Sequence, residues 1–291
     1  MPELPEVETI KKQLQKYLIG HKITDVEIRY GKKFEGDAKD LIGGKIVDVR
    51  RFGKAQSIDL NNGYSILIHI KMTGQLIYVG PNLKTKDKKL SSKITGGLGG
   101  KHTHIIFHLD KGGTLYYNDV RKFGWLHVHK TAEIKNHKFI GNLGPEPDVT
   151  GKLDEENILT LGKFKDILSK SGKPVKLLIM DQEKIGGVGN IYATDALWLA
   201  KVNPKTPANK LQRDKVTELY KAIHTVLKAG LKYGGASELA FVTPDGAEGE
   251  YQNHTLAYGQ QGKLCSRCKK AKFEKYFLGG RGTYICPICQ K

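Results

Sequence analysis

The length, composition and charge of the chain exclude several classes of protein. Its 291 residues leave room for two domains, and 39% hydrophobic residues exclude wholesale disorder. The sequence has no long apolar run and no apolar segment behind the N-terminus, so neither a membrane span nor secretion is expected. Forty-eight Lys and Arg against 30 Asp and Glu give a net charge of +18. This excess favours nucleic acid as the partner over an anionic membrane surface or a basic surface that serves solubility alone.

The N-terminal segment Met1 to Glu8 combines a helix start with a candidate nucleophile. Pro2 is small enough for Met1 to be removed, which would leave a secondary α-amine at the terminus. An α-amino group has a pKa of about 7.7–8.0, so a neutral fraction exists at cellular pH. Attack of this amine on a sugar aldehyde gives a cationic iminium that favours elimination, and Glu3 is placed to transfer protons. The alternative is that Pro2 and Pro5 merely begin a helix.

The first half of the chain is predicted to hold one helix followed by strands. Apolar residues recur at helical spacing from residue 5 to residue 20, where Gly20 ends the helix. The predicted strands cover residues 23–30, 45–52, 55–60, 64–70, 75–79, 104–109, 114–118 and 124–128. Strands in series without helices between them indicate an antiparallel sandwich or barrel. Residues 81–103 are rich in Lys and Gly, which indicates a mobile loop over phosphates or a solvated insertion.

The second half of the chain is predicted to be helical up to its last strands. The expected helices cover residues 154–160, 162–169, 174–182, 190–200 and 209–232. The glycine-rich segment Lys184 to Asn190 separates two of them. Its backbone N–H groups could meet an anion at the start of the second helix, where Asn190 adds a side-chain donor. A tight turn between two helices explains the same segment equally well.

The four cysteines form two pairs near the C-terminus, Cys265 with Cys268 and Cys286 with Cys289. The two C-x2-C pairs and the length of the segment between them match a four-thiolate zinc site. Four protein ligands leave no open position for water, so the metal is expected to be structural. Two disulfides are the alternative, but they need an oxidising compartment that nothing in the sequence indicates.

Three short segments place cations beside glycine or apolar residues. Arg281 follows two glycines at the expected hairpin tip, where its guanidinium can reach a phosphate. His69–Gly74 and Arg121–Gly124 put Met72 and Phe123 at strand ends, and such side chains can be pushed between base pairs when a nucleotide is extruded. Taken singly, a core position for the Met and the Phe and a solvated turn for the Arg explain these segments as well.

Six segments together resemble the formamidopyrimidine-DNA glycosylase family, in the family's order and over nearly the whole chain. They are Pro2–Glu8, His69–Gly74, Tyr117–Gly124, Leu143–Pro147, Gly186–Tyr192 and the ending Gly279–Gln290. Six motifs in one order are far more specific than any one of them.

The resemblance implies a base-excision repair enzyme with glycosylase and abasic-site lyase activity. Its substrate would be double-stranded DNA that contains oxidised purines, such as 8-oxoguanine and formamidopyrimidines, or abasic sites. Pro2 would attack C1′ of the damaged nucleotide, expel the base and form a Schiff base, and β- and δ-elimination would follow. Glu3 would act as the acid and base, with Glu6 in support.

The resemblance also assigns the DNA contacts. Lys54 would contact phosphate and sugar near the lesion, and it is counted among the catalytic residues as well. The space that the flipped nucleotide leaves would be filled by Met72, Arg121 and Phe123. Phosphates would be clamped by Asn190 and Arg281, and lesion recognition would involve Lys176.

The fold that the resemblance implies is α+β and multidomain. It comprises an N-terminal helix with an antiparallel β-sandwich, a helix–two-turn–helix domain, and a C-terminal zinc-ribbon β-hairpin. The predicted bounds are residues 2–135, 151–250 and 251–291, with a hinge at 136–150. We expect a monomer with one structural zinc ion, in the cytoplasm with the nucleoid and away from membranes.

Departures from the family's pattern concern specificity. Lys71 stands where the family often has glycine, and Asp195 where it usually has glutamate. The segment after Gly234 lacks the family's arginine and aspartate. Residues 234–250 hold several glycines, which indicates a mobile lid over an everted base.

Two other functions remain as alternatives. An endonuclease VIII-like glycosylase for oxidised pyrimidines is a near relative, but that branch typically has glycine at the position of Leu4. A non-catalytic zinc protein that binds damaged DNA could use the same clamp and ribbon. The Pro2–Glu3 pair argues against it, because binding alone requires neither residue.

Overall fold

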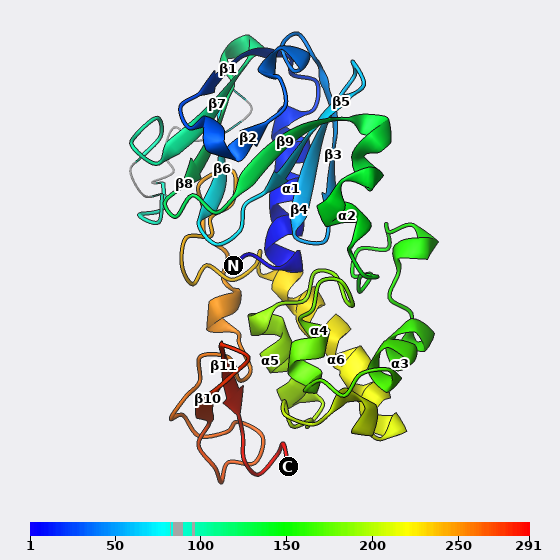
Figure 1. The fold of residues 1–291 in the computed structure, drawn as a ribbon. Helices are drawn as coiled ribbons and strands as arrows, with labels where there is room; N and C mark the ends of the chain where they lie inside the picture. The colour runs from blue at the N-terminus through cyan, green and yellow to red at the C-terminus, as the bar shows by residue number, and fades with distance from the viewer. Residues whose placement is uncertain (82, 84–89, 95–96) are drawn as a thin grey trace. The chain divides into compact units, whose positions relative to one another are not determined.

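The chain divides into two compact units in a computed structural model that describes residues 1–81, 83, 90–94 and 97–291 (Figure 1). The first unit comprises Met1–Gly141 and Tyr233–Gln252, and the second comprises Asn142–Lys232 and Asn253–Lys291. The predicted loop at 81–103 lies partly outside the described residues. Among the described helices, none is long and apolar enough to cross a bilayer.

Helix α1 (Leu4–Leu18) opens the first unit, close to the predicted span. Glu3 is its N-cap in a capping box with Glu6, and Pro5 lies in the first turn, where its missing N–H costs nothing. The apolar face of the helix is buried, and α1 contacts strands of both sheets. The helix thereby holds its own N-terminus in a fixed place on the first unit.

Two sheets follow, and all eight predicted strands are present. The four-stranded sheet has the order β1-β7-β8-β6, with β1 at Ile23–Ile28, β6 at Gly74–Val79, β7 at Thr103–Leu109 and β8 at Thr114–Asp119. The five-stranded sheet has the order β2-β9-β5-β4-β3, with β2 at Phe34–Glu35, β3 at Ile46–Phe52, β4 at Ala55–Leu60, β5 at Tyr64–His69 and β9 at Trp125–Lys130. All pairs are antiparallel except that β2, a two-residue strand that the sequence did not predict, runs parallel to β9.

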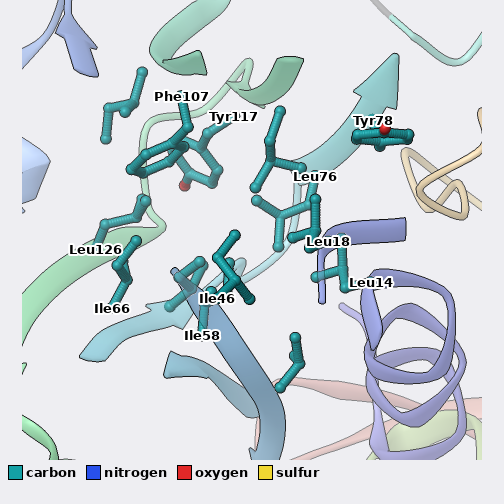
Figure 2. Close-up of a cluster of buried hydrophobic side chains, with 14 of the residues drawn as sticks. Leu14, Leu18, Ile46, Ile58, Ile66, Leu76, Tyr78, Phe107, Tyr117 and Leu126 are labelled. Carbon is teal, nitrogen blue, oxygen red and sulfur yellow. The ribbon is translucent and has the colours of Figure 1, made fainter. Parts of the chain in front are cut away.

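One hydrophobic core lies between the two sheets and α1 (Figure 2). It combines Leu14 and Leu18 of α1 with Ile58 and Ile66 of the five-stranded sheet and Phe107 of the four-stranded sheet. Because both sheets contribute to a single buried cluster, the predicted sandwich is confirmed. The antiparallel turns at its edges then present the candidate site residues between strands.

The segment 233–252 returns to the first unit and corrects the predicted domain bounds. Phe241 joins the main core, Val242 packs against Ile77, and the Tyr78 N–H donates to the Pro244 carbonyl at 2.8 Å. The segment therefore belongs with the sandwich and not with the helical domain to which residues 151–250 were assigned. Residues 241–246 of the predicted lid are buried, and its exposed residues are Glu238, Leu239, Glu248 and Glu250.

The second unit is built of helices and a terminal hairpin. Its elements are α3 (Leu161–Ser169), α4 (Val175–Ile179), α5 (Asn190–Leu199), α6 (Arg213–Lys232), β10 (Glu274–Leu278) and β11 (Arg281–Ile285). The predicted helix at 154–160 reduces to the 3-10 turn Glu155–Asn157, while α2 (Lys138–Gly141) of the first unit was not predicted. Trp198 of α5 packs with Phe273 and the cysteines, so the hairpin shares a core with the helices. The division between units falls after Gly141, inside the predicted hinge.

Candidate active site and DNA interface

The N-terminus of α1 holds the predicted nucleophile and both predicted carboxylates. Pro2, Glu3 and Glu6 are buried, whereas Met1 is 43% exposed. The Glu3 N–H donates to Glu6 Oε2 at 2.7 Å, and the Ala236 N–H donates to Glu6 Oε1 at 2.7 Å. Both oxygens of Glu6 are thus occupied by backbone donors, which gives Glu6 a positioning role. Glu3 directly follows Pro2, the predicted nucleophile.

Gly235 makes the contact with Glu6 possible. Its φ of +87° lies in the left-handed region, and a Cβ atom there would come within 2.7 Å of Glu6 Cγ. Only glycine can bring the backbone this close to the carboxylate. The sequence signal for this contact was the pair Gly234–Gly235, which had been assigned to a lid.

Lys54 lies in the turn between β3 and β4 and is buried, with 3% exposure. Burial and the nearby charges of Lys71 and Lys54 lower the pKa of His69 to about 3. The neutral His69 ring accepts the Lys71 N–H at Nδ1, at 3.0 Å. Lys71 has a φ of +49°, which explains why a glycine suits this position.

Three predicted DNA-contact residues meet at one edge of the sandwich. Arg121 Nη1 lies 3.1 Å from Met72 Sδ, and the Arg121 guanidinium lies 4.5 Å from the centre of the Phe123 ring. Phe123 is 50% exposed although it is large and apolar. A cation, a thioether and an exposed ring in contact form a surface suited to the space beside a base pair.

Asp119 fixes the loop that carries this cluster. Its carboxylate accepts the Gly124 N–H at 2.8 Å and the Arg121 N–H at 3.2 Å, and also the hydroxyl of Thr73. The two loops that hold Met72 and Arg121 are thereby joined through one side chain. Asp119 had no predicted role, although the motif Tyr117–Gly124 contains it.

The remaining predicted contacts meet in the second unit, where the hairpin approaches α4 and α5. Lys176 Nζ donates to the Gly282 carbonyl at 3.0 Å and lies 2.8 Å from Thr283 Oγ1. Asn190 Nδ2 donates to the same Gly282 carbonyl at 3.1 Å. Arg281, the neighbour of Gly282, is exposed. Lys176 is 0% exposed, so the structure gives it a place beneath the hairpin rather than at the surface.

The hairpin tip is a two-glycine turn that presents Arg281. Gly279 and Gly280 have φ values of +54° and +72°, as a tight turn with two left-handed residues requires. A Cβ atom on Gly279 would lie 2.8 Å from the Leu177 side chain, so the tip packs closely on α4. The position of Arg281 is therefore set by both the turn and the helix.

Two further residues organise the second unit and had no predicted role. Gln182 donates to the carbonyls of Met180 and Val188, each at 2.8 Å, and so closes the turn between α4 and α5. Asp195 accepts the N–H groups of Leu256, Ala257 and Tyr258 at 2.8–3.0 Å. This shorter carboxylate, where the family usually has glutamate, joins α5 to the segment that leads into the ribbon.

The four cysteines converge on one point and are free thiols. Their sulfur atoms lie within 4.8 Å of one another, with 3.9 Å between Cys265 and Cys289 and 3.7 Å between Cys268 and Cys286. A tetrahedral zinc with Zn–S bonds of about 2.3 Å separates its sulfurs by about 3.8 Å. The four residues therefore fit one metal ion, as predicted, and the alternative of two disulfides is not found among them.

Replacing Lys176 with methionine is expected to destabilise the second unit. The side chain keeps its length, but Gly282 and Thr283 lose a charged donor, which costs about 1.5–3 kcal/mol. Chemical denaturation measures the loss, and Lys173→Met, at a lysine that is 59% exposed, is the control. A weaker DNA affinity with unchanged stability would instead mean that Lys176 acts by direct contact.

Comparisons with known proteins agree with this geometry. The family model of the formamidopyrimidine-DNA glycosylase N-terminal domain matches residues 1–126, and that of the formamidopyrimidine-DNA glycosylase H2TH domain matches residues 143–241. Proteins called formamidopyrimidine-DNA glycosylase from Rickettsia conorii and Streptococcus thermophilus are 37% and 34% identical to the chain. All of the chain aligns with 99% and 100% of their lengths, respectively.

Solved structures match over the same extent. The Lactococcus lactis Fpg in complex with DNA containing an abasic site is 32% identical, with a TM-score of 0.83 and 99% of each chain covered. The wild-type L. lactis Fpg with DNA containing N7-benzyl-Fapy-dG is 31% identical, with a TM-score of 0.84 and full coverage of both chains. The fold and these matches define a DNA glycosylase. The chain belongs to the formamidopyrimidine-DNA glycosylase family.

Proposed function

We propose that the chain excises oxidised purines from duplex DNA and then cleaves the abasic site through a Schiff base on Pro2. The observation that supports this most directly is the geometry at the start of α1. Glu6 accepts hydrogen bonds of 2.7 Å from the Glu3 N–H and the Ala236 N–H, which ties the start of α1 to the segment 233–252, and Glu3 directly follows Pro2. Relatives solved with abasic and formamidopyrimidine-containing DNA support the same substrate class.

The chemistry begins once Met1 has been removed. The Pro2 nitrogen attacks C1′, the glycosidic bond breaks, and the base leaves with a proton. Loss of the C1′–O4′ bond gives the iminium, which acidifies the C2′–H and allows the C3′–O bond to break, followed by the C5′–O bond. Glu3 transfers the protons, because Glu6 is occupied by backbone donors. Lys54 contacts the phosphate and sugar beside the lesion.

The DNA contacts divide between the two units. In the first, Met72, Arg121 and Phe123 enter the space that the extruded nucleotide leaves. In the second, Asn190 and Arg281 bind phosphates, and buried Lys176 supports the strand that carries Arg281. These phosphate contacts make affinity fall with salt concentration.

The four cysteines hold one structural zinc ion in this proposal. The spacing of the four sulfur atoms supports one zinc ion. Because four thiolates complete a tetrahedral site, no position is left for water, which supports a structural role. When bound, zinc supplies no chemistry to the reaction and holds the hairpin in its fold. The net charge of +18 supports a cytoplasmic location on the nucleoid.

The substrate class is tested on duplexes that carry one defined lesion. We expect strand cleavage at 8-oxoguanine and at formamidopyrimidine, and much slower cleavage at thymine glycol. Faster cleavage at thymine glycol would assign the chain to oxidised pyrimidines. Tight binding to every duplex with no cleavage at all would identify a non-catalytic damage-binding protein.

Glu3→Gln should lower base excision about 10²–10⁴-fold and leave cleavage of a preformed abasic site nearly unchanged. Expulsion of the base needs a proton that glutamine cannot supply, and the abasic aldehyde has already passed that step. Single-turnover rates on the two substrates measure the difference. Glu6→Gln is the matched variant. The NH2 group of the glutamine would face one of the two backbone N–H groups that Glu6 binds, so the rates of base excision and of abasic-site cleavage should fall together. Equal losses in Glu3→Gln would assign Glu3 a positioning role as well.

A further inference from the structure

Three histidines gather on the first unit, at residues that the proposed reaction does not use. His127 and His129 are two residues apart on β9, so they lie on one face of the five-stranded sheet. Leu126 and Val128, between and beside them, point the other way into the core. His137 follows the 3-10 helix Thr131–Asn136 and folds back onto this face.

The ring nitrogens of the three histidines are close enough to share one ion. His127 Nδ1 and His137 Nε2 are 3.0 Å apart, and one nitrogen from each of the three rings lies within 4.8 Å of the others. Zn–N bonds of about 2.0–2.1 Å in a tetrahedral site separate ligand nitrogens by about 3.4 Å. His129 Nε2 is buried and has no hydrogen-bond partner among the described residues, so this nitrogen is available as a ligand for a metal ion.

The surroundings orient the rings as they do in metal sites. His127 Nε2 lies 3.5 Å from Glu35 Oε2, so its other nitrogen, Nδ1, faces the cluster. A carboxylate behind a ligand imidazole fixes the ring and raises its basicity. Trp125 stacks on His127 and on His137, with ring centres 4.4 Å and 5.3 Å apart. Two rings of the cluster are therefore held in place without a metal.

Without an ion, a hydrogen bond joins His127 and His137 at the place where the ion would bind. The Phe139 N–H lies 3.2 Å from His137 Nδ1, so neutral His137 carries its proton on Nε2 and donates it to His127 Nδ1. An ion at Nε2 displaces that proton to Nδ1 and gives up the long hydrogen bond from Phe139. That exchange gives up two hydrogen bonds, the one from the Phe139 N–H and the one between His137 and His127, and it forms three metal–nitrogen bonds.

We propose that His127, His129 and His137 form a binding site for a divalent transition-metal ion, separate from the cysteine site. Imidazole ligands suit Zn²⁺, Ni²⁺ and Cu²⁺. Three protein ligands leave one position for water or an anion. The ion joins β9 to the start of α2, so it orders the last residues before the division between the units at Gly141.

Metal stoichiometry tests the site on the full-length protein already loaded at its cysteines. After equilibration with excess Zn²⁺ and desalting, we expect two zinc ions per chain, and one in His129→Ala. His108→Ala, a half-buried histidine on β7 of the same unit, should keep two. Glu35→Gln should weaken the second site about 10–100-fold in a calorimetric titration.

A second measurement separates loss of the site from loss of the fold. Added Zn²⁺ should slow amide hydrogen exchange in residues 131–141 of the wild type and leave that segment unaffected in His129→Ala. Without added metal, His129→Ala and His108→Ala should have the same melting temperature as the wild type. One zinc per chain in the wild type, or two in His129→Ala, would overturn the proposal.

Discussion

Blocking the amine of Pro2 is expected to abolish the covalent complex that borohydride traps on abasic DNA. A variant with one extra residue retained ahead of Pro2 converts the secondary amine into an amide, which cannot form an iminium. Trapped product should fall to the detection limit, and strand cleavage at the abasic site should fall with it. Duplex affinity should stay nearly unchanged, because the proposed DNA contacts lie on other elements.

The matched control for this variant is Pro2→Gly with Met1 removed. Its primary amine can still form an imine, so we expect a reduced but measurable covalent product. Peptide mapping of the trapped complex should locate the DNA on the N-terminal residue in both the wild type and this control. Trapping of the extended variant at the wild-type yield would assign the nucleophile to a lysine, with Lys54 the first to test.

The sequence predicted the elements of the sandwich because each strand carries its own local signal. Asn61-Asn62-Gly63 marks the turn between β4 and β5, and the apolar, largely β-branched run Ile66 to Ile68 marks β5. Both strands are buried along nearly their whole length. Strand β2 has two residues and pairs parallel with β9, and no local pattern encodes so short an element. The segment 154–160 was expected to be a helix, but only the 3-10 turn Glu155–Asn157 forms. No residue of that turn is buried, so no apolar packing stabilises a longer helix.

The site was predicted as a set of residues but not as a set of contacts. Glu6 and Ala236 are 230 positions apart, and only the fold brings the N–H of one to the carboxylate of the other. The glycine pair before Ala236 therefore looked like the start of a mobile lid. In the same way Lys176 was assigned to lesion recognition, and its contacts with Gly282 and Thr283 were not predicted because these partners lie 106 and 107 positions away.

Removing one zinc ligand is expected to cost metal, hairpin structure and DNA affinity together. Structural zinc sites contribute about 10–16 kcal/mol of apparent binding free energy, which is lost when Cys268→Ser removes a thiolate. The hairpin shares its core with Trp198, so its loosening should also lower the melting temperature of the second unit. Zinc content, circular dichroism and a DNA titration measure the three effects on one sample.

Arg281→Ala separates the phosphate contact from the fold that presents it. Arg281 is exposed and none of the cysteines depends on it, so zinc content and melting temperature should stay at wild-type values. DNA affinity should fall about 10–100-fold, the equivalent of one charged hydrogen-bonded contact at about 1.5–3 kcal/mol. If Cys268→Ser lost its zinc and yet bound DNA as the wild type does, the ribbon would have no part in DNA binding. An unchanged affinity in Arg281→Ala alone would leave the metal's structural role intact and move the phosphate contact elsewhere on the second unit.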